Sequence, residues 1–207
     1  MEIYWGIGAV VMAYLLGSIP SAVWIGRVFH GVDVREHGSK NAGATNTIRV
    51  LGTKVGIVVL VIDILKGFVA VFLCGYLPIS LSDEMYALMR VIVALSAVLG
   101  HVAPLYVGFK GGKGVATLFG VVVALFPYQV ILIEIVLFFI IFVITKYVSL
   151  GSIIVSIFLP ILLFVFFPMP HSIEFLAVVI AVFVPFTHRK NIRRLLNGEE
   201  TKLFFKK

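Results

Sequence analysis

The sequence is poor in charged residues, and acidic residues are scarcer than basic ones. Asp and Glu number 10 and Lys and Arg 17 among 207 residues, so 13% of the chain is charged while 61% is hydrophobic. A soluble domain is about half apolar and about a quarter charged, because polar residues must enclose its core. This chain has too few polar residues for such a surface. The composition excludes an ordinary soluble domain and predicts helices that face lipid.

Several chemical signatures are also missing. The single cysteine, Cys74, excludes a disulfide framework within one chain. No His, Cys and Asp cluster has the spacing of metal ligands, and there is no Gly-x-Ser-x-Gly elbow. The His-x-x-x-x-Asp pair typical of acyltransferases that activate a hydroxyl with histidine is absent too. We therefore expect no metal and no cofactor, and the uniform composition predicts one domain over residues 1–207.

Apolar runs long enough to cross a bilayer recur along the chain. A span needs about 17–25 mostly apolar residues at 1.5 Å per residue. The fourth run is short and ends at Pro127, and the fifth run follows at once. A single span through both runs would be longer than the hydrocarbon layer, so we predict two spans that meet at Pro127. The sequence predicts an all-α membrane protein with seven transmembrane helices, over residues 3–26, 54–77, 86–107, 114–127, 128–145, 149–167 and 173–187.

Basic residues mark one side of these spans. With alternating connections, one side receives the Lys and Arg residues of 27–54, 110–113, Lys146 and the tail 189–207. The loops of the other side carry acidic residues and neither Lys nor Arg. Because short cytoplasmic loops are enriched in Lys and Arg, we predict an outside N-terminus and a cytoplasmic C-terminus. The net charge of +7 then reflects membrane topology and not nucleic-acid binding.

The first polar segment, residues 38–49, lies between the first two predicted spans. Its hydroxyl and amide side chains can donate hydrogen bonds to phosphate, and Arg49 supplies charge. Its glycines allow the backbone to approach a ligand closely. The alternative is a flexible polar loop, since Gly and Asn are common in turns. We favour ligand binding, because the segment combines many donors with few carboxylates.

The second polar segment, residues 100–117, contains Gly108-Phe-Lys-Gly-Gly-Lys-Gly114 just before a predicted helix. A glycine-rich loop before a helix N-terminus favours an anion. The spacing differs from a Walker A motif, and no nearby carboxylate offers to hold Mg²⁺, so an anion site without nucleotide hydrolysis is predicted. For Lys110 and Lys113 the alternative is plain basicity at the membrane edge. For His101 a structural hydrogen bond is favoured over a chemical role.

The third polar segment, residues 188–194, directly follows the last predicted span. His188 and Asn191 are three residues apart and share a helical face. A histidine can handle a proton or bind a phosphoryl oxygen, so we favour a functional role for this pair. The basic residues around it are better explained by topology. Ser149 begins the sixth span, either as a helix cap or as part of the same polar cluster.

Charged residues also occur inside the predicted spans, where burial is costly. Asp63 and Lys66 are three residues apart and can pair, either structurally or in transport. Glu134 stands alone and has no assigned role. The polar groups as a whole form a cationic set at one membrane surface. Such a set suits a phosphorylated substrate whose apolar tail lies among the helices.

These segments together closely resemble the bacterial acyl-phosphate:glycerol-3-phosphate acyltransferase family. Lys-Gly-Gly-Lys-Gly-Val-Ala-Thr is a specific string, whereas Gly-Ser-Ile-Pro alone is weak. The matching strings occur in order over essentially the whole chain: Gly17-Ser-Ile-Pro20, Gly38-Ser39, Asn41-x-Gly-Ala-Thr-Asn46, Arg49-x-Leu-Gly52, Gly100-His101, Phe109-Lys-Gly-Gly-Lys-Gly-Val-Ala-Thr117 and His188-Arg-x-Asn191. Lys40 falls at a variable position and is assigned no role.

The resemblance implies a multi-pass enzyme of the bacterial inner membrane with its active site facing the cytoplasm. It would transfer a fatty acyl group from acyl phosphate to glycerol 3-phosphate, giving lysophosphatidate in the first acylation step of phospholipid synthesis. It implies catalytic roles for Ser39, Arg49, Lys113, His188 and Asn191. The expected substrate-binding residues are Asn41, Thr45, Asn46, His101, Lys110, Gly111, Gly112, Gly114, Thr117 and Ser149.

The expected partners are the two substrates and membrane lipid, with no nucleic acid, and the chain is expected to act as a monomer. Acyl phosphate is an activated anhydride, so no covalent enzyme intermediate is needed. The proton of the glycerol hydroxyl would pass either to His188 or to a substrate phosphate oxygen. The competing function is a transporter of a phosphorylated metabolite, but inverted repeats and a site at the bilayer midplane are not apparent.

Overall fold

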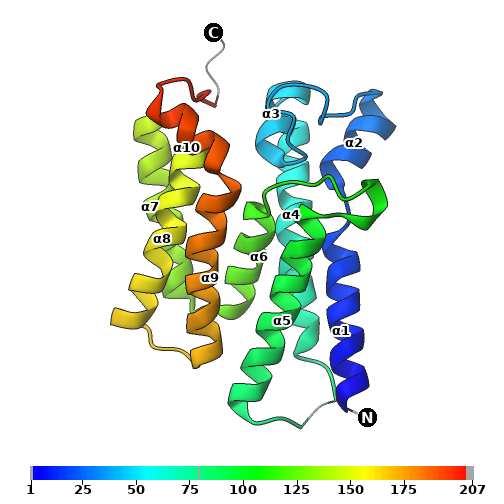
Figure 1. Ribbon diagram of the computed structural model, residues 1–207, viewed down its shortest axis with the longest axis vertical. Helices are drawn as coiled ribbons and strands as arrows, with labels where there is room; N and C mark the ends of the chain where they lie inside the picture. The colour runs from blue at the N-terminus through cyan, green and yellow to red at the C-terminus, as the bar shows by residue number, and fades with distance from the viewer. Residues whose placement is uncertain (1, 79, 204–207) are drawn as a thin grey trace. The chain divides into compact units, whose positions relative to one another are not determined.

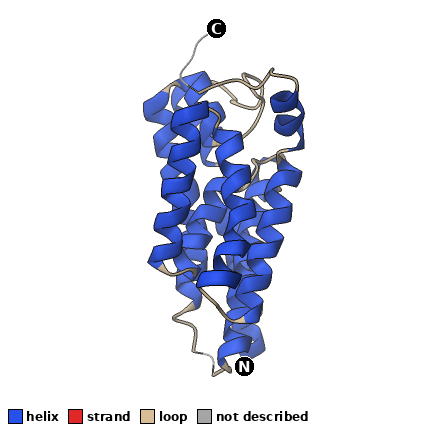
Figure 2. Ribbon diagram, turned by 90° about the vertical axis from the view of Figure 1, so that its left-hand side faces the viewer, coloured by secondary structure: helices blue, strands red, loops and turns tan. Residues whose placement is uncertain are grey.

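The computed structural model describes residues 2–78 and 80–203, and every regular element within these ranges is a helix (Figure 2). The predicted all-α fold is confirmed. The chain divides into two compact units, Met1–Leu125 and Phe126–Lys207, which are described separately. The predicted single domain stays a prediction, and residues 204–207 of the predicted basic tail lie outside the described part of the chain.

In the first unit, helix α4 is the central element. It contacts α1, α2, α3, α5 and α6, and α2, α3 and the loop after α5 lie at the same end of this unit (Figure 1). The elements of this unit are α1 (Glu2–Gly17), α2 (Ser21–His30), α3 (Ala44–Leu51), α4 (Thr53–Cys74), α5 (Asp83–Val102), the 3₁₀ helix η1 (Leu105–Val107) and α6 (Val115–Leu125).

Glycines allow the helices of the first unit to approach closely. A Cβ atom on Gly67 of α4 would collide with the backbone of Thr117 in α6, and one on Gly100 of α5 would collide with the backbone of Tyr14 in α1. Membrane helices lack a hydrophobic driving force toward one another, so small residues at their interfaces maximise van der Waals contact. These contacts fix α5 and α6, which are connected by a segment that contains the glycine-rich loop, residues 108–114.

In the second unit, α8 packs against both α7 and α9, and α10 follows α9. The elements are α7 (Tyr128–Thr145), α8 (Val148–Phe166), α9 (His171–Thr187) and α10 (Arg189–Leu196). The chain bends by 61° between α9 and α10. Because of this bend, the third polar segment forms a separate helix whose axis turns away from that of the apolar helix α9.

The helix positions agree with most of the predicted spans. Within the described residues, four helices are long and apolar enough to cross a membrane, or up to six if the bent pairs α1–α2 and α9–α10 each count as one span. Within the predicted span 3–26 the chain breaks between α1 and α2 at Pro20, which lacks a backbone donor and restricts Ile19, so the span stays a prediction in the form of a bent helix pair. Helix α6 has 11 residues, shorter than an independent span.

Residues 44–51, which overlap the first polar segment, lie in a helix that was not predicted. They form α3, whose Ile48 packs against Gly56 of α4 so closely that a Cβ atom there would collide with it. Packing of this kind overrides a weak local preference, since most helical stability in proteins comes from tertiary contact.

Candidate active site

Asn46 folds the loop that precedes α3. Its side-chain Nδ2 donates to the carbonyl oxygens of Val34, His37 and Asn41 at 2.7, 3.1 and 3.0 Å, and its Oδ1 accepts from the backbone N of Ser39 at 2.7 Å. Asn46 is 1% exposed. The amide predicted to bind substrate is thus used by the backbone of its own loop. Its direct contact with substrate stays a prediction.

The loop held by Asn46 presents the first polar segment. Gly38 has φ of 60°, and a Cβ atom there would collide with Asn46 Oδ1, so only glycine fits. Ser39 is exposed at the turn that follows, whereas Asn41, Thr45 and Arg49 are half-buried. The geometry therefore offers the Ser39 hydroxyl and the face of α3 to a ligand, supported by a buried amide.

The glycine-rich loop, residues 108–114, is shaped by its backbone. Positive φ angles occur at Gly108, Phe109 and Gly114, at 70°, 60° and 82°. The backbone N–H groups of Gly111 and Gly112 donate to carbonyl oxygens at the end of α5, each at 3.2 Å. These two predicted anion-facing amides are thus occupied by the protein. Lys113 is half-buried beside the N-terminus of α6, where its contact with an anion stays a prediction, while Lys110 is exposed.

A buried ionic cluster supports this loop from below. Lys66 Nζ lies 2.8 Å from Asp63 Oδ1, which also accepts from Ser21 Oγ at 2.7 Å. His101 Nδ1 lies 3.1 Å from Thr117 Oγ1 and 3.7 Å from Asp63 Oδ1. All five side chains are buried. The structural role favoured for His101 matches this geometry, and its predicted contact with substrate, like that of Thr117, stays a prediction.

The first two polar segments meet in the first unit. Ala42 O lies 3.1 Å from the position that a Cβ atom on Gly112 would occupy. A small hollow is lined by Ala42 of the first segment, by Gly111 and Gly112 of the second, and by Ser21 and Lys66 beneath them. Residues far apart in sequence thus form one polar surface at the end of the unit where α2 and α3 lie (Figure 1).

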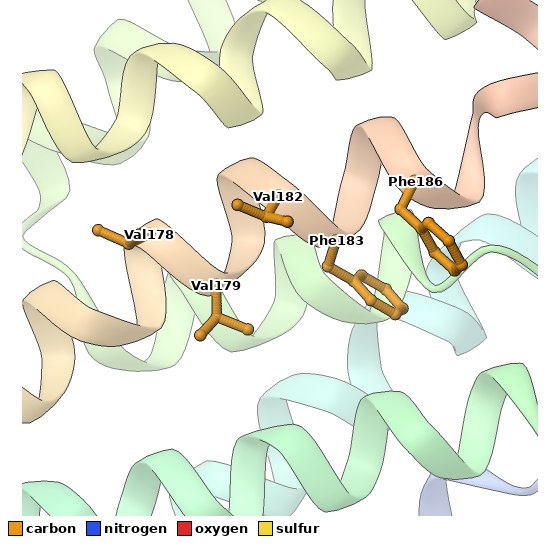
Figure 3. Close-up of a pocket in the computed structure, with 5 residues that line it drawn as sticks. All are labelled: Val178, Val179, Val182, Phe183 and Phe186. Atoms are coloured by element: carbon orange, nitrogen blue, oxygen red, sulfur yellow. The ribbon is translucent and has the colours of Figure 1, made fainter.

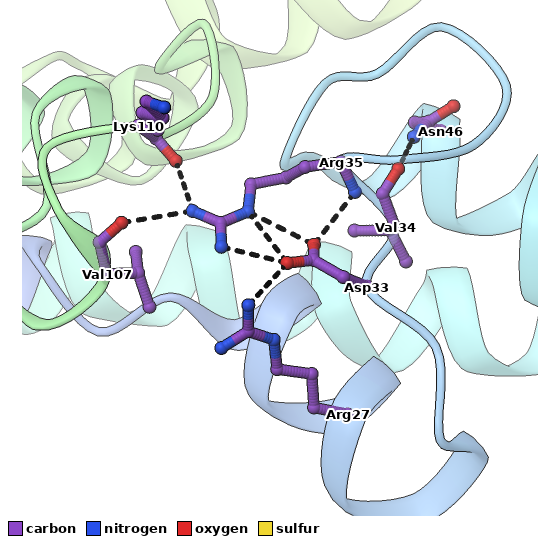
Figure 4. A network of polar contacts seen from close by, with 7 residues as sticks. All are labelled: Arg27, Asp33, Val34, Arg35, Asn46, Val107 and Lys110. Atoms are coloured by element: carbon purple, nitrogen blue, oxygen red, sulfur yellow. Dashed lines mark hydrogen bonds and ion pairs between the residues drawn. The ribbon is translucent and has the colours of Figure 1, made fainter.

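Arg35 ties the same two segments together. Its Nη1 donates to the carbonyl oxygens of Val107 and Lys110 at 3.0 and 3.2 Å, while its Nη2 donates to Asp33 Oδ2 at 2.9 Å (Figure 4). Hydrogen bonds from Arg35 hold the pKa of Asp33 well below its usual range, against the opposing effect of burial. From the sequence, Arg35 was expected to contribute only to membrane topology. The spacing of two residues between Asp33 and Arg35 was the sequence signal that could have predicted their ion pair.

In the second unit, Glu200 gathers the polar residues of α8 and α10. Its Oε1 accepts from Ser149 Oγ at 2.9 Å and from Asn191 Nδ2 at 2.6 Å, and its Oε2 accepts from Arg194 Nε at 2.7 Å. Burial raises the pKa of Glu200, but the hydrogen bonds from Arg194, Asn191 and Ser149 outweigh it and hold the pKa below its usual value. Ser149 and Asn191 are therefore brought together, through a carboxylate that the sequence analysis did not consider.

His188 lies between α9 and α10 and is buried. Its Nδ1 is 2.8 Å from the carbonyl oxygen of Val184. A carbonyl oxygen only accepts, so Nδ1 carries the proton, and Nε2 is the basic nitrogen of the neutral ring. This tautomer suits a proton acceptor. Among residues 2–78 and 80–203, no three His, Cys, Asp or Glu side chains gather where they could hold a metal ion.

Residues 7–198 match the family model described as Glycerol-3-phosphate acyltransferase. The chain belongs to this family. A glycerol-3-phosphate acyltransferase of Fusobacterium nucleatum is 47% identical over 197 residues, which cover 95% of this chain and 97% of the relative. One of Listeria welshimeri is 42% identical, covering 93% and 94%.

Two solved structures of the family are also similar. The crystal structure of PlsY, an integral membrane glycerol 3-phosphate acyltransferase, in its glycerol 3-phosphate form has a TM-score of 0.86 and 40% identity, covering 95% of this chain and 94% of that one. The lysophosphatidic acid form has a TM-score of 0.82 and 39% identity over the same shares. The family predicted from the motifs is confirmed, and the chain is a multi-pass membrane protein with an acyltransferase fold.

Proposed function

We propose that this protein transfers a fatty acyl group from acyl phosphate to glycerol 3-phosphate, releasing phosphate and forming lysophosphatidate, the first acylated intermediate of phospholipid synthesis. The observation that carries the proposal is the similarity, over 95% of the chain, to an acyltransferase solved in its glycerol 3-phosphate form. The second solved form, with lysophosphatidic acid, corresponds to the product.

The first unit supplies the phosphate site in this proposal. Lys113 and Arg49 neutralise phosphate charge, and Ser39, Asn41 and Thr45 donate hydrogen bonds to phosphate or glycerol oxygens. The juxtaposition of Ala42 with Gly112 supports a common surface for these residues. Fixed donors and cations stabilise the charge that develops on the carbonyl oxygen and the departing phosphate.

The acyl transfer itself needs one proton acceptor. The glycerol hydroxyl oxygen bonds to the acyl carbon, the bond between that carbon and the phosphate oxygen breaks, and phosphate leaves with the electron pair. The hydroxyl proton passes to His188 Nε2 or to a phosphate oxygen. The Val184 carbonyl supports the first route by fixing the His188 tautomer, and Asn191 with Ser149 extends the polar wall of the second unit.

The apolar tail of the donor requires an apolar surface. Five side chains of α9 line an open hollow in the second unit (Figure 3), namely Val178, Val179, Val182, Phe183 and Phe186. An acyl chain lying there gains van der Waals contact and leaves no polar group unsatisfied. We place this surface within the bilayer, in a seven-span topology with the N-terminus outside. The polar segments then face the cytoplasm of a bacterial inner membrane.

The deciding assay uses the purified protein in detergent with palmitoyl phosphate and glycerol 3-phosphate, without added metal, and follows phosphate and lysophosphatidate. We expect product from palmitoyl phosphate and none from palmitoyl-CoA. Lys113→Ala should lower kcat/KM by about 100-fold or more, because a charged contact to the transferring phosphate is lost. If product forms equally from palmitoyl phosphate and palmitoyl-CoA, and equally in Lys113→Ala, the proposed phosphate site is wrong.

A second assay tests the proton acceptor. If His188 Nε2 takes the proton, His188→Ala should lower kcat by about 100-fold or more, the usual range for a general base, with a small change in KM for glycerol 3-phosphate. The matched control is His171→Ala, which removes an exposed histidine at the start of α9. Nearly intact turnover in His188→Ala would assign the proton to a substrate phosphate oxygen instead.

A further inference from the structure

The glycine-rich loop needs outside support to keep one shape. Phe109 adopts a left-handed conformation, at φ of 60°, next to Gly108 at 70°, and a residue other than glycine persists in this conformation only where its surroundings hold it. Phe109 is exposed, so burial of its ring does not fix it. The contacts that define the loop are therefore hydrogen bonds to its backbone.

Support on one side comes from α5. The carbonyl oxygens of His101 and Val102 accept from the backbone N–H groups of Gly112 and Gly111, each at 3.2 Å. These bonds fix the second half of the loop. They do not reach the turn at Gly108, which links η1 to that half and where the backbone N of Phe109 donates to Pro104 O at 2.9 Å.

Support on the other side comes from Arg35. The same Nη1 atom donates to Val107 O, before the turn, and to Lys110 O, after it. One guanidinium nitrogen thus closes the turn formed by Gly108 and Phe109 (Figure 4). Val107 and Lys110 come from a segment more than 70 positions along the chain from Arg35.

Asp33 holds Arg35 in this position. Its carboxylate accepts from Arg35 Nε at 3.1 Å, from Nη2 at 2.9 Å and from the backbone N of Arg35 at 2.9 Å. The two-pronged geometry suits a planar guanidinium and not an ammonium group. Because its donors are already engaged by Asp33 and by the carbonyl oxygens of Val107 and Lys110, Arg35 is suited to shaping the loop and not to binding phosphate itself.

We propose that Arg35, oriented by Asp33, is a positioning residue that sets the shape of the glycine-rich loop for the acceptor phosphate. The inference rests on the proposed role of this loop in holding glycerol 3-phosphate. Arg27 provides an internal control. It also donates to Asp33 Oδ2, at 2.8 Å, but its side chain is 56% exposed.

The test compares Arg35→Gln, Arg35→Lys and Arg27→Gln in the full-length protein. We expect Arg35→Gln to raise KM for glycerol 3-phosphate about tenfold or more, with kcat changing less, because displaced groups bind the substrate poorly. Arg35→Lys should show a similar but smaller rise, since it keeps the charge and loses the fork. Hydrogen–deuterium exchange of peptides covering residues 105–114 should be faster in both, and unchanged in Arg27→Gln.

The two readouts separate the alternatives. Unchanged KM and exchange in Arg35→Gln would overturn the inference, and so would a raised KM without faster exchange, which indicates direct substrate contact. If Arg35→Gln fails to fold, Arg35→Lys decides by the same criteria. Lys113→Ala serves as the separate test of the phosphate site. Normal KM in that variant removes the proposed function of the loop, whereas a raised KM there with normal Arg35 variants removes only the role of Arg35.

Discussion

Gly112→Ala is expected to lower kcat/KM by about 100-fold or more, the usual cost of displacing a substrate-holding group by about 1 Å. A Cβ atom at this position would collide with His101 Nε2 and lie 3.1 Å from Ala42 O. The imidazole has little room to withdraw, because its Nδ1 is engaged with Thr117 and Asp63 inside a buried cluster. The loop would have to move instead, and Lys113 with it. Steady-state kinetics with glycerol 3-phosphate varied at saturating acyl phosphate measures the effect.

Gly108→Ala is the control within the same loop. No atom lies within 4 Å of a Cβ atom at Gly108, so the only cost is the left-handed backbone, at φ of 70°. That strain is about 1 kcal/mol, equivalent to a change of about fivefold. Equal losses in the two variants would show that general flexibility of the loop, and not the contact of Gly112 with His101, governs activity.

The helices were predictable where lipid dictates their length and composition. Helices α4, α7 and α8 begin and end within a few residues of the predicted spans, because a hydrocarbon layer requires long apolar runs. The break at Pro20 was missed because it falls inside an apolar run of suitable length. Helix α3 was missed for the opposite reason, since its Thr, Asn, Ile and Val residues are weak helix formers that depend on packing against α4.

The polar segments of the site were also predictable, because donors and cations stand out in an apolar chain. Their supporting contacts were not. Arg35 reaches carbonyl oxygens 72 and 75 positions away, and Ser149 meets Glu200 across 51 positions. Backbone carbonyls carry no sequence signal, and one acidic residue in a basic tail resembles ordinary surface charge. Such contacts become visible only when the fold brings the segments together.

Glu200→Gln is expected to lower both activity and stability. The substitution keeps the size of the side chain but places an amide among the three donors Ser149, Asn191 and Arg194, so at least one hydrogen bond to a charged acceptor is lost. Such a change at a buried site costs about 1.5–3 kcal/mol. The apparent unfolding temperature should fall by several degrees, and kcat should fall because Asn191 and Ser149 are no longer held. Glu199→Gln, which alters the exposed neighbour, should leave both unchanged.

The pH dependence of the unfolding temperature, compared between Glu200→Gln and the unmodified protein, separates the effect of the Glu200 charge from the effect of its packing. Because the folded protein depresses the pKa of Glu200, its carboxylate contributes stability above the unfolded pKa of about 4.3, and loses it as pH falls through the lower folded pKa. The unfolding temperature of Glu200→Gln should therefore lie below that of the unmodified protein from neutral pH down to about pH 5 and approach it at lower pH. A difference that persists unchanged at low pH would assign the effect of Glu200 to packing and not to its charge.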